Sequence, residues 1–375
     1  MARAKIQDVA RLAGVSLSTV SAVINNKSVV SEQTRQRILE SIDRLHYRPS
    51  LYARNLARRD MRILGVIVST LQNPFFAETA QSIEDEAERL GYAISLAATN
   101  FSTERLRSAV QQMLGARVSG LAIMTSESDK AAFEIITQSG VPCVYLDVGK
   151  PGPNSTNIRV DMRGGMIEAV KHLIDLGHRD LLLVRNAPKH SGPALRTHRY
   201  RDQGFAAAIR AGGPLKLRTQ IVAVDGSGAP AGEEAIASVI GHFPFTAVVA
   251  FSDIVALGVY RGLQKRGVDI PREVSVVGFD NTYFSSFLNP PLTTVNIPRD
   301  DLSRMVVECL TKPAGSKHRT SSLRLATDLI VRESTALPPA VAERRTHLRA
   351  GARDGLAKLV RSAPDGHVSG LSAAE

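Results

Sequence analysis

Residues 6–25 read IQDVARLAGVSLSTVSAVIN, a stretch in which two helical patterns meet at a glycine. Apolar residues recur with helical spacing on both sides of that glycine, at Val9, Ala10, Ala13, Val20 and Val23. Gly14 can adopt the positive φ of a tight turn between two helices, and Ser16 is placed to cap the second helix. The pattern predicts a helix-turn-helix unit.

A third helix is predicted to follow. Ser31 is a favourable N-cap, and apolar residues then recur on one helix face at Ile38, Ile42 and Leu45. Any three-helix bundle would show this pattern. The outward side chains of the second helix, however, are small and polar, which leaves its backbone free to approach a groove; they are Ser16, Ser18, Thr19, Ser21 and Asn25. We therefore favour DNA binding over a plain bundle.

The distribution of charge agrees with this interpretation. The 375 residues carry a net charge of +11, and residues 1–62 alone hold twelve Lys or Arg against five Asp or Glu, a net charge of +7. A solvated basic face would give the same count. Together with the helix-turn-helix pattern, the excess indicates a polyanionic partner.

The segment after the third helix is basic and interrupted by proline. Pro49 ends that helix, and residues 51–59 (LYARNLARR) have the pattern of a short helix with apolar Leu51, Ala53 and Leu56. A helix of this length is marginal in water, so we expect it to become ordered on DNA. A plain linker is the alternative.

Residues 6–57 closely resemble the N-terminus of the lactose-repressor (LacI/GalR) family, and the resemblance continues to about Pro338. It implies a repressor that acts as a homodimer on operator DNA. Residues 51–59 then match the family's hinge helix, and Leu56 matches its minor-groove wedge. Leu17, Ser18 and Ala22 match the positions that face base edges. The predicted DNA-binding residues are Ser16, Leu17, Ser18, Thr19, Ser21, Ala22, Asn25, Tyr47, Arg54 and Leu56.

From Ile63 onward, short apolar runs alternate with amphipathic stretches. The predicted strands are 63–69, 92–98, 120–125, 143–147, 181–184, 221–224, 247–251 and 275–279. The helical segments between them include 76–90, 103–114, 162–176, 199–211 and 253–266. This alternation predicts parallel sheets covered on both faces. The expected fold is therefore an all-α helix-turn-helix domain joined to an α/β core of two parallel-sheet subdomains.

Ligands of such sheets bind beyond the carboxyl ends of the strands. The residues that follow the predicted strands there are Asn73, Phe75, Phe76, Asp147, Arg201, Ser252, Asp253, Asp280 and Asn281. Carboxylates accept hydroxyl hydrogens and aromatic rings cover a ring face, so this set suits a polar small molecule. Singly, Asp253 is equally well a helix N-cap, and Phe75 or Phe76 a core residue. Their common placement favours a site.

The resemblance supports the same site. It implies a core similar to periplasmic sugar-binding proteins, with the effector contacted by Phe75, Asp147, Arg201, Asp253 and Asp280, and with Asn296 at a further polar position. Two features depart from the family. Residues 224–228 (VDGSG) lack the aromatic that many members carry after the sixth strand, and the loop 185–198 is longer and more basic. We expect a carbohydrate-like effector, with a nucleobase or other metabolite acting as corepressor as the alternative.

The expected domains are 1–48 (helix-turn-helix), 49–61 (hinge), 62–338 (effector-binding and dimerisation core) and 339–375 (a disordered tail). Within the core, the N-lobe is expected at about 62–160 and 294–322, and the C-lobe at about 161–293 and 323–338.

Several function classes are set aside. The sequence has no G-x-S-x-G, H-E-x-x-H or P-loop motif, so a sugar-modifying enzyme is a remote alternative. Cys143 and Cys309 lie in apolar runs and are expected to be buried thiols. We expect no cofactor, no metal and no membrane span. The N-terminus has no secretory pattern, which argues against a transport receptor and for the cytoplasm.

Overall fold

The computed structural model describes residues 4–24, 30–47, 62–147, 152–186, 196–226, 228–312 and 321–339. The chain divides into two compact units, Met1–Arg62 and Ile63–Glu375. The predicted hinge at 49–61 and nearly all of the tail lie outside the described residues. Among the residues that are described, no helix is both long and apolar enough to cross a membrane.

The first unit is the predicted helix-turn-helix with its third helix. Its helices are α1 (Ile6–Ala13), α2 (Leu17–Ile24) and α3 (Glu32–Arg44). Gly14 has the expected positive φ of 64°. Ser16 Oγ accepts from the backbone N–H of Thr19 at 3.2 Å, and Ser31 caps α3. The core of the unit consists of Val9, Ala10, Ala13, Val20, Val23, Ile38 and Tyr47.

The second unit contains two six-stranded sheets. In spatial order, the first consists of β11 (Ser321–Leu325), β5 (Ser155–Val160), β4 (Cys143–Leu146), β3 (Gly120–Met124), β1 (Ile63–Val68) and β2 (Ala93–Ala98). The second consists of β12 (Asp328–Ile330), β10 (Thr293–Asn296), β9 (Ser275–Asp280), β8 (Ala247–Ala250), β6 (Asp180–Asn186) and β7 (Arg218–Val224). All pairings are parallel except that of β10 with β12. The parallel-sheet prediction is confirmed.

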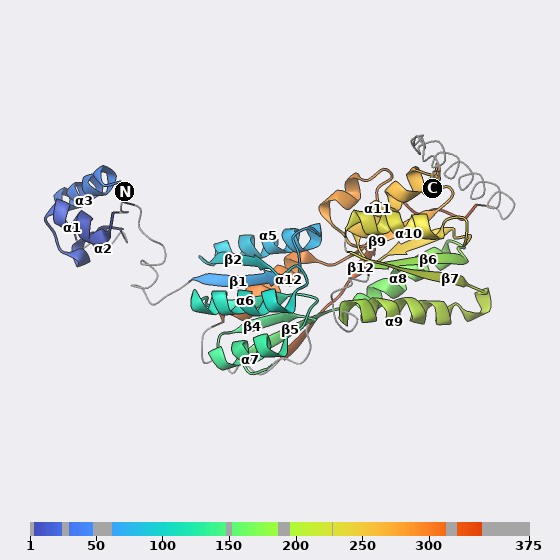
Figure 1. Cartoon of the computed structure of the whole chain (residues 1–375), viewed down its shortest axis with the longest axis horizontal. Coiled ribbons are helices and arrows are strands. Elements are labelled where there is room, and N and C mark those ends of the chain that lie inside the picture. Colours follow the sequence, from blue (N-terminus) through green and yellow to red (C-terminus); the bar gives the residue numbers. More distant parts are fainter. Residues whose placement is uncertain are drawn as a thin grey trace, which may run out of the picture. The chain divides into compact units, whose positions relative to one another are not determined.

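Helices cover both faces of each sheet (Figure 1). They are α5 (Pro74–Arg89), α6 (Thr103–Gly115), α7 (Lys130–Ser139), α8 (Met162–Asp175), α9 (Arg196–Ala211), α10 (Ala229–Val239), α11 (Asp253–Gln264) and α12 (Arg299–Thr311), with 3-10 turns η1 (Gly213–Leu215) and η2 (Tyr283–Phe287). Successive residues of β1 show the two faces: Val66 packs in the cluster that includes α5 and α12, and Ile67 in the cluster that includes α6 and α7. Side chains therefore alternate between two cores, as a sheet covered on both faces requires.

The chain crosses between the two lobes three times. The first crossing lies after Val160, where β5 of the first sheet ends. The other two predicted boundaries fall inside strands. Strand β10 pairs with β9 of the second sheet, whereas all of β11 pairs with β5 of the first. The N-lobe is therefore 63–160 and 299–325, and the C-lobe is 161–296 and 328–336.

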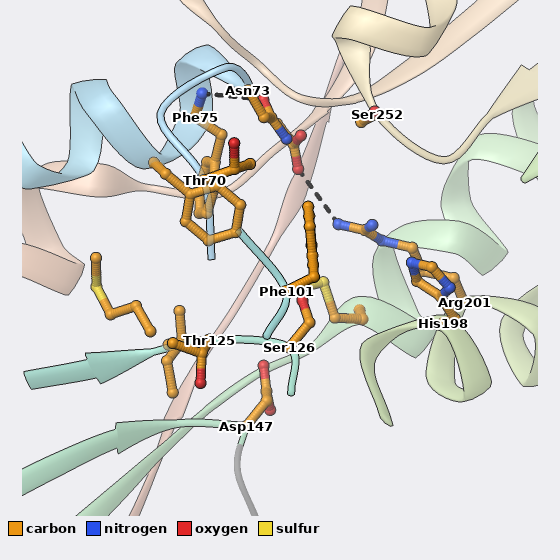
Figure 2. Close-up of a pocket in the computed structure, with 15 residues that line it drawn as sticks. Thr70, Asn73, Phe75, Phe101, Thr125, Ser126, Asp147, His198, Arg201 and Ser252 are labelled. Atoms are coloured by element: carbon orange, nitrogen blue, oxygen red, sulfur yellow. Dashed lines mark hydrogen bonds and ion pairs between the residues drawn. The ribbon is translucent and has the colours of Figure 1, made fainter. Parts of the chain in front are cut away.

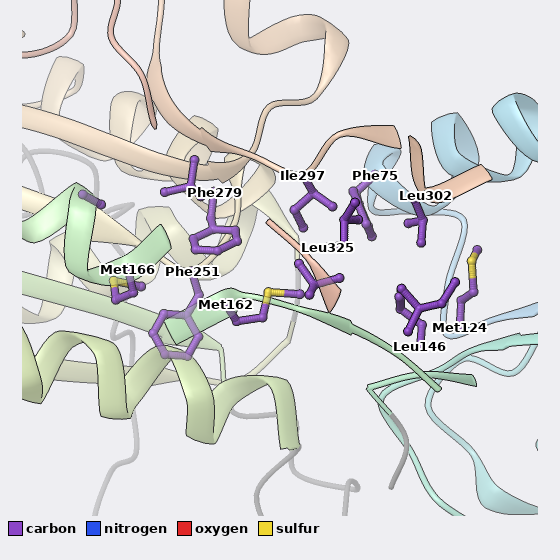
Figure 3. Packing of buried hydrophobic residues seen from close by; sticks show 14 of the residues in the cluster. Phe75, Met124, Leu146, Met162, Met166, Phe251, Phe279, Ile297, Leu302 and Leu325 are labelled. Carbon is purple, nitrogen blue, oxygen red and sulfur yellow. The ribbon is translucent and has the colours of Figure 1, made fainter. Parts of the chain in front are cut away.

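A single apolar cluster runs through both lobes at these crossings (Figure 3). Met162, Ile297 and Leu325 lie at the three crossing segments, and all three side chains are buried. They join Phe251 and Phe279 of the C-lobe to the N-lobe side chains around Leu302, so the lobes share packed contacts where the chain passes between them.

The two cysteines are free thiols, as predicted. Cys143 is buried, but Cys309 is only half-buried, which corrects the expectation of two buried residues.

Candidate functional site

The second helix of the small unit presents the surface that was predicted to meet DNA. Leu17 is 46% exposed, and Ser16 and Ser18 beside it are also exposed. Ser16 Oγ lies 2.7 Å from Ser18 Oγ and 2.8 Å from Thr19 Oγ1, so the hydroxyls form one polar cluster around an exposed leucine. The remaining predicted residues of this helix, Ser21 and Ala22, are half-buried.

The other predicted DNA contacts have a different outcome. Asn25, Arg54 and Leu56 lie outside the described residues. Tyr47 packs in the core of the unit, because the chain folds back at the end of α3 and the Tyr47 N–H donates to Ile42 O at 2.9 Å. Burial also raises the pKa of its hydroxyl. The position of Tyr47 corrects the prediction that it lies on the DNA-binding surface.

A pocket lies between the lobes of the larger unit, at the carboxyl ends of both sheets (Figure 2). It encloses about 700 Å³ of empty space, a volume that includes the open solvent at its mouth. Its lining includes predicted residues from both lobes: Asn73, Phe75, Phe76, Asp147, Arg201, Ser252 and Asp280. The residues predicted from the carboxyl ends of the strands are thus brought together around one pocket.

Three residues of the predicted set do not line this pocket, namely Asp253, Asn281 and Asn296, and Asp253 is the clearest correction. The Asp253 side chain is fully buried. Its Oδ2 accepts from the N–H and hydroxyl of Thr282 at 2.7 and 2.9 Å, and its Oδ1 accepts from Thr294 Oγ1 at 2.6 Å. The carboxylate thus holds the loop after β9 and the neighbouring strand β10 in place. It has a structural role beneath the pocket.

Asn296 is the second correction. It lies half-buried on β10. Its amide Nδ2 donates to Asp328 Oδ1 at 3.0 Å, and its Oδ1 accepts from Asn281 Nδ2 at 3.0 Å. Both ends of the amide are therefore used within the C-lobe.

Replacing Asp253 by alanine is expected to lower the free energy of unfolding by about 3 kcal/mol, because the substitution leaves buried donors of Thr282 and Thr294 without an acceptor. Chemical denaturation of the full chain measures this loss. A loss below about 0.5 kcal/mol would contradict the structural role. The exposed Asp175→Ala, at a residue that forms a surface ion pair with Lys171, is the control.

Several lining residues were not predicted. They are Thr70, Phe101, Met124, Thr125, Ser126, Leu146, Met162 and His198. Thr70 and Thr125 follow β1 and β3 closely, so the strand-end rule applied to every strand would have found them. Phe101 lies in a turn at φ 62° beyond β2. His198 comes from the first turn of α9 and had no comparable signal.

A buried carboxylate fixes the N-lobe loops of the pocket. Ser69 Oγ donates to Glu127 Oε2 at 2.9 Å, and the Thr99 hydroxyl donates to Glu127 Oε1. The N–H of Ser126 in turn donates to Ser69 Oγ at 2.7 Å. Because these residues follow β1, β2 and β3, Glu127 ties together the three loops that carry Thr70, Phe101 and Ser126.

The C-lobe contributes an ion pair. Arg201 Nη2 lies 3.2 Å from Asp280 Oδ1, and both side chains are buried. The guanidinium carbon of Arg201 lies 4.1 Å from the centroid of the Phe279 ring. Burial raises the pKa of Asp280 to about 7, against the opposing effect of Arg201. The Asp280 carboxyl is therefore poised to gain or lose a proton near neutral pH.

This pKa predicts a pH-dependent stability. The folded pKa of about 7 lies above the ordinary value of 3.8, so the folded state binds this proton more tightly than the unfolded state. The resulting stabilisation is present in full below pH 3.8 and is lost as the pH rises through 7. Thermal unfolding should show wild type losing stability relative to Asp280→Asn between about pH 5 and 8. Parallel pH profiles of the two proteins would contradict it.

A polar contact joins the two lobes beside the pocket. Glu78 of α5 accepts from the backbone N–H of Tyr283 at 3.0 Å and pairs with Arg299 at 3.3 Å. Arg299 Nη1 in turn donates to the carbonyl oxygen of Asp280 at 3.0 Å. Glu78 and Arg299 of the N-lobe are thus linked by polar contacts to Tyr283 and Asp280 of the C-lobe, and Asp280 lines the pocket.

Family models match segments of both the small helical unit and the larger unit. Residues 5–50 match the family model for bacterial regulatory proteins of the lacI family, and residues 170–335 match a periplasmic binding protein-like domain. The HTH-type transcriptional repressor PurR of Photobacterium profundum is 32% identical over 333 residues, which cover 88% of this chain and 98% of that repressor. This chain belongs to the lacI family. The LacI-family fold and the repressor class are those expected from its sequence.

Solved structures show the LacI-family fold along most of the chain. The lac repressor dimer bound to operator and the anti-inducer ONPF is 28% identical, with a TM-score of 0.73, and the match covers 89% of this chain and all of that chain. The transcriptional regulator CelR in complex with cellobiose is 27% identical, with a TM-score of 0.64, and the match covers 88% and 100%. This LacI-family protein is a DNA-binding transcriptional repressor and not an enzyme.

Proposed function

We propose that this repressor is controlled by a carbohydrate-like effector bound between the two lobes. The observation that carries the proposal is the convergence of predicted polar and aromatic side chains from both lobes on one pocket. The carboxyl groups of Asp147 and Asp280 offer acceptors for hydroxyl hydrogens, and Arg201 offers a rigid donor fork. Phe76 and Phe101 offer faces for a sugar ring. Polar groups thus approach from opposite sides, which suits a polyhydroxylated molecule.

An effector bound between the lobes can change the affinity of the protein for DNA. A molecule that contacts Asp147 of the N-lobe and Arg201 of the C-lobe stabilises one arrangement of the lobes over others. The operator also binds one arrangement of the lobes better than others. If effector and operator prefer the same arrangement, each strengthens the other's binding, and if they prefer different arrangements, each weakens it, typically by about 1–3 kcal/mol. We propose that the protein acts as a homodimer in the cytoplasm, with α2 reading the operator and the predicted hinge carrying Leu56.

A nucleobase is the second candidate. Phe101 and His198 add aromatic surface to the pocket beyond what the sequence indicated, so a flat heteroaromatic ring has more stacking partners than expected. One observation weighs against a nucleobase: residues 224–226 and 228, where many family members carry an aromatic residue, do not line the pocket. Relatives named PurR also favour this class of effector.

Calorimetry on the full chain distinguishes the candidates. The probes are cellobiose, D-ribose, hypoxanthine and guanine, each titrated into wild type, Asp147→Asn and the exposed control Asp175→Asn. We expect a sugar to bind wild type and the control alike, and to bind Asp147→Asn about ten-fold more weakly. If only a nucleobase binds, the carbohydrate proposal is wrong and the effector is a nucleobase. Binding of none of the four would contradict the proposal.

A further inference from the structure

Two buried histidines of the C-lobe have opposite surroundings. His178 is 1% exposed, and its ring nitrogens have three partners: Nδ1 lies 2.9 Å from Thr246 Oγ1, and Nε2 lies 3.0 Å from Ser275 Oγ and 2.9 Å from Ala336 O. This is the usual state of a buried polar side chain. His178 therefore has a structural role that its own contacts explain.

His198 is 8% exposed, but no hydrogen bond to its ring nitrogens exists within the part of the chain that the structure describes. The ring packs edge to face against Phe251, with the centroids 5.4 Å apart. The ring nitrogens are not among the buried side-chain atoms of the described residues that lack a partner, so they remain accessible at the space beside the ring. The space that the ring borders is where a partner can be supplied.

That space is the pocket. His198 lines it and lies one helical turn before Arg201 on α9 (Figure 2). The first two turns of α9 therefore bring an imidazole and a guanidinium to the same side of the cavity. Arg201 is already paired with Asp280, whereas the imidazole has no such partner among the described residues.

The protonation state of His198 defines what it can recognise. Burial, together with the nearby charges of Arg201 and Arg185, lowers its pKa to about 3. The ring is therefore neutral at physiological pH. A neutral imidazole has one N–H donor and one bare nitrogen acceptor, so its complement is a group that both accepts and donates a hydrogen bond.

We propose that His198 binds the effector directly, through a hydroxyl group of the carbohydrate next to the Arg201–Asp280 pair. This inference rests on the proposed function and adds to it a specificity-determining residue. A hydroxyl both accepts and donates, so it satisfies either edge of the imidazole that faces it. His198 then selects effectors that carry a hydroxyl at the end of the pocket lined by α9.

The test compares variants of the full chain with wild type by calorimetry and thermal unfolding, with cellobiose, D-ribose, hypoxanthine and guanine as probes. His198→Leu removes both hydrogen-bonding atoms, and His198→Gln keeps a donor and an acceptor. We expect His198→Leu to bind the sugar about ten-fold more weakly and His198→Gln to stay within about three-fold of wild type. The ligand-free Tm of His198→Leu should stay close to that of wild type, because the substitution breaks no hydrogen bond among the described residues.

His178→Leu is the matched control. It removes a buried imidazole with three partners, so its Tm should fall, whereas the sugar affinity of its folded fraction should match wild type. Sugar binding by His198→Leu as tight as by wild type would overturn the inference, as would equal weakening in the leucine and glutamine variants together with a lower Tm. Failure of wild type to bind either sugar would overturn the proposed carbohydrate function, and this inference with it.

Discussion

Arg201→Ala is expected to weaken effector binding by about 100-fold and to lower the free energy of unfolding by about 3 kcal/mol. Arg201 lies in the pocket and pairs with the buried Asp280 at 3.2 Å. Its loss removes a charged donor from the effector and leaves a buried carboxyl without its partner. The stability loss falls at the low end for a broken buried pair, because the raised pKa lets Asp280 take up a proton.

Calorimetry and chemical denaturation measure the two effects. Arg201→Lys is the matched control, since lysine keeps the positive charge but not the planar fork. We expect it to restore most of the stability and little of the affinity. Unchanged affinity in Arg201→Ala would show that the effector binds elsewhere. An affinity fully restored by lysine would show that charge alone is recognised.

Val20→Asp is expected to abolish operator binding, by at least about 100-fold, without changing effector affinity. Val20 has no exposed surface in the core of the small helical unit. A carboxylate there has no partner, and a core of this size cannot accommodate it. The larger unit has its own apolar clusters, so its pocket should remain intact.

The comparison requires DNA selected by the wild-type protein from a random pool. Fluorescence anisotropy then measures binding by Val20→Asp and by the control Leu39→Asp, which places the same charge at an exposed position of α3. Leu39→Asp should remain folded and bind within about ten-fold of wild type. Operator binding by Val20→Asp, or loss of its effector binding, would contradict the division into two independently folded units.

The helical unit could be predicted from the sequence because its signals are local. Gly14 supplies the turn, Ser16 and Ser31 supply the caps, and apolar spacing supplies the core. Tyr47 was misplaced because periodicity does not show which way a side chain turns after a helix ends.

The strands of the larger unit were predicted where they are buried and apolar. The strands β5, β10, β11 and β12 were missed, since runs such as STNIRV and TTVN are short and rich in polar residues. Those same strands lie at or near the lobe crossings, so the predicted lobe boundaries shifted with them.

The expectation that ligands bind beyond the carboxyl ends of the strands identified the correct edge of the sheets. It did not predict which side chains there face the pocket and which are buried beneath it. Asp253 follows β8 as predicted, yet its carboxylate turns inward to Thr282 and Thr294. His198 reaches the pocket from the first turn of α9, and only the tertiary structure brings it there. Phe101 lies in the turn just after β2, a strand end from which no site residue was predicted.

The central claim is that occupancy of this pocket controls operator affinity. Its most direct test is an anisotropy titration of the full chain on the selected operator, with and without each sugar that binds in calorimetry, for wild type and Asp147→Asn. We predict that at least one sugar changes the operator affinity of wild type by about 5- to 150-fold. At the same sugar concentration, Asp147→Asn should show little change. A sugar that saturates the wild-type pocket and leaves its operator affinity unchanged would contradict the account.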